Sequence, residues 1–139
     1  MNKSRKLSQV LFVCVHNAGR SQMAEAFFNQ LAKGKARAVS AGTAPADAVG
    51  PTVVEVMQEV GIDISGNKPK LLTADMVQQA DMLVTMGYGV EGVCPATFAE
   101  TDTWGLEDPK GKPLPELRRI RDEIRARVTE LLKRIEYNN

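Results

Sequence analysis

The hydrophobic positions of the chain alternate between two spacings. Residues 10–13 are a short continuous run of β-branched and aromatic side chains, which is typical of a strand buried on both faces. Between residues 21 and 33, apolar side chains recur every three to four positions, which predicts a helix, and Gly34 follows as a stop. Residues 36–43 predict a second strand. The chain therefore begins with the order strand, helix, strand.

The later part of the chain continues this alternation. Pro51 stands at the first position of one predicted helix, and Gly61 follows its last turn. Thr73 is the expected cap of another helix. The last helix has one apolar stripe and one charged face. The predicted elements are a helix from Pro51 to Gly61, a short helix after Thr73 to about residue 79, strands at 81–86 and 101–106, and a helix from about 114 to 137.

Alternating strands and helices predict an α/β fold, in which helices cover both faces of a parallel sheet. Right-handed crossovers bring the carboxyl ends of the strands to one edge, where such sheets bind ligands. Cys14, Gly87 and the segment around Asp108 each follow a predicted strand. We therefore expect these three segments to meet at that edge.

Composition and charge restrict the class of protein. The chain has 139 residues, of which 43% are hydrophobic and 25% charged, as in ordinary globular domains. This size predicts one domain over residues 1–139, with residues 1–8 as a flexible tail. A net charge of +1 gives no strong field for nucleic acid or an acidic membrane surface. No stretch approaches the ~20 apolar residues of a membrane span. Because no apolar stripe is left over, we expect a monomer.

The two cysteines, Cys14 and Cys94, do not make a disulfide framework. This predicts a reducing, cytoplasmic environment in which thiols stay free. The single histidine and two distant cysteines cannot build a zinc site. We therefore expect no metal and no tightly bound cofactor.

The strongest chemical signal lies between Cys14 and Ser21. Five residues separate Cys14 from Arg20, which is enough to wrap a loop of inward-pointing amides around a tetrahedral oxyanion. The helix that begins at Ser21 adds the positive end of its dipole, and a guanidinium can bind two oxygens at once. The predicted oxyanion-binding residues are Val15, His16, Asn17, Ala18, Gly19 and Arg20.

Cys14 is the expected nucleophile at the bottom of this loop. Surroundings that bind an oxyanion also stabilise a thiolate, which is the reactive form of cysteine. Ser21 is suited to donate a hydrogen bond to the sulfur, and Asn17 to hold the loop through neighbouring backbone. Gly19 is expected to adopt a backbone angle closed to other residues. We expect the side chain of His16 to point away from the oxyanion. The competing interpretation, a buried inert cysteine, does not explain why arginine and serine follow at the start of a helix.

Two more residues are candidates for chemistry. Asp108, followed by Pro109, is expected above the loop, where it could protonate a leaving oxygen; the alternative is a simple turn. Cys94 ends a glycine-rich loop over residues 87–94 and could attack an adduct on Cys14 to form a disulfide. A packed thiol without function explains Cys94 equally well.

These residues resemble the low-molecular-weight protein tyrosine phosphatase superfamily, and more closely its arsenate reductase branch. Phosphatases of the family tend to have proline where Gln22 stands, and aromatic residues where Lys110-Gly111-Lys112 follow Asp108-Pro109. The resemblance implies a single three-layer domain with a four-stranded parallel sheet of order 2-1-3-4. It is carried by Val10 to Cys14, Asn17, Arg20 to Glu25, and segments 40–43, 62–65, 104–105, 108–109 and 121–124.

By this resemblance, Cys14 attacks arsenate and forms a covalent cysteine–arsenic adduct while Asp108 protonates the departing oxygen. A second thiol then attacks Cys14, and arsenite leaves. Thioredoxin-coupled members carry two cysteines after the third strand, whereas this chain has Gly87 in place of the first and only Cys94 as the second. The resolving thiol is therefore Cys94 or an external reductant, namely thioredoxin, a glutaredoxin with glutathione, or a small thiol such as mycothiol or bacillithiol.

Two other functions remain open at this point. The same loop could serve a phosphatase that hydrolyses phosphate monoesters through a phosphocysteine. It could also serve an oxyanion sensor without turnover, although binding alone needs neither Cys14 nor Asp108.

Overall fold

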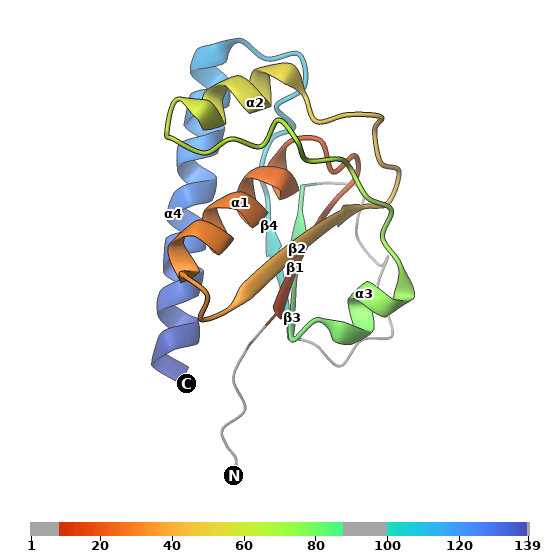
Figure 1. Ribbon diagram of the computed structural model, residues 1–139, viewed down its shortest axis with the longest axis vertical. Coiled ribbons are helices and arrows are strands. Elements are labelled where there is room, and N and C mark those ends of the chain that lie inside the picture. The colour runs from red at the N-terminus through yellow and green to blue at the C-terminus, as the bar shows by residue number, and fades with distance from the viewer. Residues whose placement is uncertain (1–8, 88–99, 139) are drawn as a thin grey trace.

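The computed structural model describes residues 9–87 and 100–138, which contain both strands and helices (Figure 1). The predictions for residues 1–8 and for Cys94 lie outside the described residues. In chain order the elements are β1 (Gln9–Cys14), α1 (Arg20–Ala32), β2 (Arg37–Gly42), α2 (Pro51–Gln58), α3 (Ala74–Gln79), β3 (Met82–Met86), β4 (Glu100–Trp104) and α4 (Leu114–Asn138).

The four strands form one parallel sheet in the order β2-β1-β3-β4, which confirms the predicted fold class. Cys14 pairs in register with Gly42 of β2, and Met86 of β3 pairs with Trp104 of β4. Because all strands run the same way, the segments that follow Cys14, Met86 and Trp104 leave the sheet at one edge. The candidate site is built at that edge.

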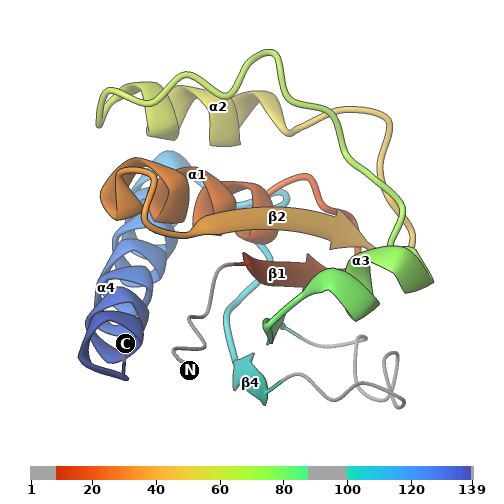
Figure 2. The ribbon, with the colours of Figure 1, turned by 60° about the horizontal axis from the view of Figure 1, so that its bottom comes forward.

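The two faces of the sheet are covered unequally. Val10, Phe12 and Cys14 of β1 face the larger core, which α1, α2 and α4 complete. Leu11 and Val13 face the smaller core against α3. Figure 2 shows α3 on the opposite side of the sheet from α1 and α4. Burial on both faces explains why β1 is a continuous apolar run rather than an alternating one.

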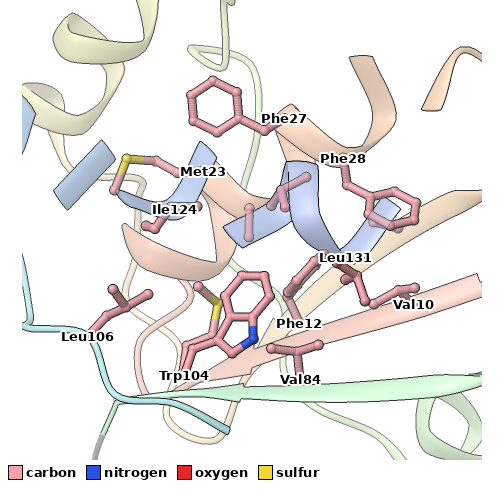
Figure 3. Close-up of a cluster of buried hydrophobic side chains, with 14 of the residues drawn as sticks. Val10, Phe12, Met23, Phe27, Phe28, Val84, Trp104, Leu106, Ile124 and Leu131 are labelled. Carbon is pink, nitrogen blue, oxygen red and sulfur yellow. The ribbon is translucent and has the colours of Figure 1, made fainter. Parts of the chain in front are cut away.

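Aromatic side chains fill the larger core beneath the site (Figure 3). The ring of Phe12 lies 6.1 Å from that of Phe28 and 5.6 Å from that of Trp104, measured between centroids. Cys14 belongs to this cluster and is 2% exposed. The reactive end of β1 is therefore fixed in close-packed surroundings.

Some boundaries differ from the predictions for local reasons. α1 begins at Arg20 because the carbonyl of Gly19 already accepts the first helical hydrogen bond, from the amide of Met23. α2 ends at Gln58, before Gly61, because the chain turns and Gly61 takes a φ of +83°. β4 ends at Trp104, two residues early, because the amide of Leu106 bonds back to the carbonyl of Trp104. Within residues 9–87 and 100–138, no helix is long and apolar enough to cross a membrane.

Candidate active site

Residues 15–19 connect β1 to α1 and form the loop that the cysteine motif predicts. The carbonyls of Val15, His16 and Ala18 accept hydrogen bonds from the amides of Ala44, Ala46 and Gly50, at 2.8, 3.0 and 3.0 Å. A trans peptide points its carbonyl and the following N–H in opposite directions. Binding these carbonyls on the outside therefore turns the next amides, those of residues 16, 17 and 19, toward the inside of the loop.

The sulfur of Cys14 lies at the floor of this loop and receives hydrogen bonds from two groups. The amide of Asn17 donates to Sγ at 3.2 Å, and Oγ of Ser21 lies 2.9 Å from Sγ. Because Oγ of Ser21 already accepts from Nδ2 of Asn17 at 2.7 Å, its own hydrogen is free to donate to the sulfur. Both contacts stabilise a negative charge on sulfur.

The side chain of Asn17 bonds to other side chains and to one distant amide, not to the neighbouring backbone that was predicted. Its Nδ2 also donates to Oγ of Ser40 at 3.0 Å, and its Oδ1 accepts from the amide of Lys70 at 2.9 Å and from Nε2 of Gln22 at 3.2 Å. The side chain is completely buried with both amide hydrogens and both lone pairs of its oxygen used. This one residue joins the loop to α1, β2 and the segment before α3.

The glycine prediction for this loop needs a correction. The left-handed backbone angle occurs at Asn17, with a φ of 51°, whereas Gly19 has a φ of −145°. Asparagine tolerates this region better than most residues because its side chain bonds locally. Gly19 is needed for space, because a Cβ there would lie 2.7 Å from Cγ of Pro109. The contact brings the Asp108 segment down onto the loop.

A second row of polar groups supports Asn17 from behind. Oγ of Ser40 donates to Oε1 of Glu25 on α1, and the ammonium of Lys70 lies 3.8 Å from the same oxygen. The carboxylate therefore has both a hydrogen bond and a counter-charge, as a partly buried charge requires.

Arg20 is 5% exposed and lies beside the loop with one edge of its guanidinium free. Nη1 donates to the carbonyl of Leu106 at 3.1 Å, and Nη2 lies 3.9 Å from Oδ2 of Asp108. Nε is buried and has no hydrogen-bond partner among the described residues. A buried donor without a partner is costly, and an oxyanion bound along the Nε–Nη2 edge would supply the partner.

Gly87 makes room for this arginine, and the sequence reasoning did not assign it that role. It follows β3 with a φ of +84°, and a Cβ there would lie 1.8 Å from Nη1 of Arg20. The available signal was a glycine directly after a strand at the ligand-binding edge, but its partner lies 67 residues away in the chain.

Asp108 lines the same cavity as Cys14 and Arg20. Its Oδ1 accepts from the amide of Lys110 at 3.0 Å, and the amide of Lys112 bonds to the carbonyl of Pro109 at 3.1 Å. Gly111 has the positive φ, +76°, that this tight turn requires. The side chain of Asp108 is 48% exposed, so it can exchange protons with solvent.

Cys14, His16, Arg20 and Asp108 line one cavity of about 340 Å³. Of its other lining residues, Thr52 is polar, Lys110 is charged, and the rest are small or apolar: Ala18, Gly19, Ala46, Ala48, Gly50, Pro51, Val53, Pro109 and Gly111. The predicted loop residues, Ser21 and Asp108 are thus brought together at the sheet edge, while Cys94 lies outside the described residues. Among the residues that the structure describes, no group of His, Cys, Asp or Glu could hold a metal ion.

Known proteins are similar to this chain in sequence and in fold. The family model of the low molecular weight phosphotyrosine protein phosphatases matches residues 9–139. The chain belongs to this family. Among its relatives in the family, an arsenate reductase of Brevibacillus brevis is 40% identical over 121 residues, which cover 86% of this chain and 90% of that protein.

Solved structures of this family include both reductases and phosphatases. The thioredoxin-dependent arsenate reductase of Corynebacterium glutamicum has a TM-score of 0.83 and 37% identity, with 99% of this chain and 66% of that chain covered. A low molecular weight protein tyrosine phosphatase from T. tengcongensis has a TM-score of 0.83 and 29% identity, with 91% and 99% covered. The family therefore combines two reactions on one fold.

Proposed function

We propose that this chain is an arsenate reductase, which reduces arsenate to arsenite through a covalent bond between the sulfur of Cys14 and arsenic. The observation that carries the proposal is the convergence on Cys14 of two hydrogen bonds, a ring of amides and a buried arginine with a free edge. The identity of 40% to a curated arsenate reductase favours arsenate as the substrate.

The first half of the reaction uses the loop and Asp108. Arsenate oxygens bind the amides of the loop and the Nε–Nη2 edge of Arg20, where charge-assisted hydrogen bonds are strong. The thiolate of Cys14 attacks arsenic, so that a sulfur–arsenic bond forms and an arsenic–oxygen bond breaks. Asp108 gives its proton to the departing oxygen, which leaves as water.

The second half needs another thiol. Its sulfur attacks Sγ of Cys14 and forms a disulfide, while the electron pair of the sulfur–arsenic bond stays on arsenic. Arsenic is thereby reduced from the +5 to the +3 state and leaves as arsenite. We propose Cys94 or an external reductant as the source of this thiol. Thioredoxin is favoured among external reductants by the neighbour from Corynebacterium glutamicum, and a glutaredoxin–glutathione or mycothiol system is the alternative.

The second candidate function is hydrolysis of phosphate monoesters through a phosphocysteine. It is supported by family membership and by the 29% identity to a solved phosphatase. Among the described residues no Phe, Tyr or Trp lines the cavity, and a phosphotyrosine ring would need such a side chain to stack on, which argues against that substrate.

One pair of assays distinguishes the two functions. The purified protein is given arsenate with thioredoxin, thioredoxin reductase and NADPH, and NADPH oxidation is followed; the glutaredoxin and mycothiol systems are tested in the same way. In parallel, hydrolysis of p-nitrophenyl phosphate is measured, with Cys14→Ser as the inactive control in both. We expect arsenate-dependent oxidation of NADPH. Rapid phosphate release without arsenate reduction by any of the three systems would favour the phosphatase instead.

The same assay identifies the resolving thiol. If Cys94 attacks Cys14, Cys94→Ser abolishes turnover, and the variant releases arsenite only when a small thiol is added. Unchanged turnover in Cys94→Ser would show that the thiol comes from the reductant.

A further inference from the structure

His16 is part of the loop, and its ring is bonded to the neighbouring segment of the chain. The ring is exposed, and its Nδ1 lies 3.2 Å from the carbonyl oxygen of Ala44. A carbonyl only accepts hydrogen bonds, so Nδ1 carries the hydrogen and neutral His16 is held in the tautomer with a bare Nε2. Among the described residues Nε2 has no partner, so it is free to accept a proton.

The ring lies where the resolving thiol must arrive. His16 and Cys14 line the same cavity, and its volume of about 340 Å³ lies in the range of sites for organic ligands, so an oxyanion leaves part of it free. The amide of Asn17 and Oγ of Ser21 contact the sulfur of Cys14 on the protein side, and Arg20 lines the same cavity. An attacking sulfur therefore approaches from the open side, past His16 and Asp108.

The proposed reaction requires a proton acceptor at this point. A thiol is mostly protonated near neutral pH, and only its thiolate attacks sulfur. Asp108 has given up its proton in the first half-reaction, but its carboxylate is occupied by the amide of Lys110 and lies near Arg20. Imidazole is the side chain that takes and releases protons near neutral pH.

We propose that Nε2 of His16 is the general base of the reductive step, which rests on the proposed function. It accepts the proton of the incoming thiol as that sulfur bonds to Sγ of Cys14. The sulfur–arsenic bond breaks, its electron pair stays on arsenic, and the proton passes from Nε2 to an oxygen of the departing arsenite. The role is the same whether the thiol belongs to Cys94 or to an external reductant.

Charged residues of both signs lie near His16. A second hollow lined by His16 also contains Arg20, Glu107, Asp108, Lys110 and Lys112. Hydrogen bonds from Arg119 and Lys112 lower the pKa of Glu107, which keeps this carboxylate ionised beside the two lysines. His16 thus faces both signs of charge from the 107–112 segment and a guanidinium from α1.

Two matched variants test the role of Nε2. In His16→Asn, Nδ2 takes the position of Nδ1 and keeps the hydrogen bond to Ala44, but the base is gone. In His16→Gln, the amide reaches the position of Nε2 and the bond to Ala44 is lost. Arsenite release is measured in a single turnover with pre-bound arsenate. One arm uses the full chain without added thiol, and the other uses Cys94→Ser with 2-mercaptoethanol.

In whichever arm releases arsenite, we expect both variants to be slower by about 10²-fold near pH 7, since general base catalysis contributes ~10²–10⁴. The difference in rate between wild type and variant should disappear above about pH 9, where a thiol of ordinary pKa ~8.5 ionises without a base. A His16→Asn variant with wild-type rates overturns the proposal, and so does a loss that is equal at all pH values, which indicates a structural role. If arsenite is released in neither arm, nor by the wild-type chain with the thioredoxin, glutaredoxin or mycothiol system, the proposed function fails and this inference with it.

Discussion

Substituting Gly87 should separate the function of Arg20 from the stability of the fold. In Gly87→Ala the new Cβ would lie 1.8 Å from Nη1 and 2.8 Å from Cζ of Arg20. Non-bonded carbon contacts are about 3.5 Å, so the guanidinium has to move by about 1.7 Å. The guanidinium is the end of a flexible side chain, so it can move without unfolding the protein. It then loses its hydrogen bond to the carbonyl of Leu106 and the position in which its Nε–Nη2 edge could bind an oxyanion.

The matched control is Gly34→Ala. Gly34 has a φ of +85°, against +84° for Gly87, and a Cβ there meets nothing within 4 Å. Both variants lose roughly 1–2 kcal/mol from placing a side chain in the left-handed region. Gly87→Ala loses a further ~1.5–3 kcal/mol with the hydrogen bond from the charged Nη1.

The activities of the two variants should also differ. Removing one preorganised donor from a site that stabilises developing charge typically costs ~10²–10³ in kcat. We expect a loss of this size in arsenate reduction for Gly87→Ala and a near-normal rate for Gly34→Ala. Urea unfolding gives the stabilities, and the NADPH-coupled assay gives the rates. Equal rates in the two variants would refute the assigned position of Arg20.

Three further outcomes follow from the site and from the contacts between helices. Ser21→Ala should slow alkylation of Cys14 by iodoacetamide several-fold near neutral pH, because the thiolate loses a hydrogen bond, whereas unchanged alkylation would mean that the hydroxyl does not donate to sulfur. Asp108→Asn should lower the rate of adduct formation by ~10²-fold or more while arsenate binding changes little, as measured by rapid quench; a loss confined to binding would contradict the role as an acid. Hydrogen bonds from Arg118, and to a lesser extent from Arg121, lower the pKa of Glu59 below its ordinary 4.5. The contribution of Glu59 to stability is therefore present above that pH and is lost as the pH falls through the lower folded value. Glu59→Gln should therefore have a lower Tm than the wild type at neutral pH, and a Tm difference that persisted in acid would contradict this sign.

The sequence predicted most of the elements because the local pattern decides them. The buried run of β1 and the apolar stripe of α4 appear as expected, and Thr73 caps α3 by accepting from the amide of Met76 at 3.2 Å. The errors are at the ends of elements, where single hydrogen bonds decide. β4, for example, ends when the chain turns back at Leu106, and no feature of the apolar pattern marks that turn.

The site was predictable only as far as its residues are consecutive in the chain. Cys14, Arg20 and Ser21 lie within eight positions, and their spacing already implies an oxyanion loop. The position of Arg20 against Gly87 depends instead on residues from separate elements, because Arg20 begins α1, Gly87 follows β3 and Leu106 follows β4. Likewise, the partners of Asn17 on β2 and before α3 become neighbours only through sheet register, which one sequence does not reveal.

The saturated amide of Asn17 has a consequence for selectivity in a cell. A binding loop that is already rigid when empty recognises only the geometry and charge of a tetrahedral anion, and phosphate shares both with arsenate. Abundant phosphate then competes with arsenate for the loop. At a concentration of a hundred times its dissociation constant, phosphate would add about 2.7 kcal/mol to the free energy of unfolding. Discrimination between the two anions has to arise after binding, at the step where arsenic accepts two electrons and phosphorus does not.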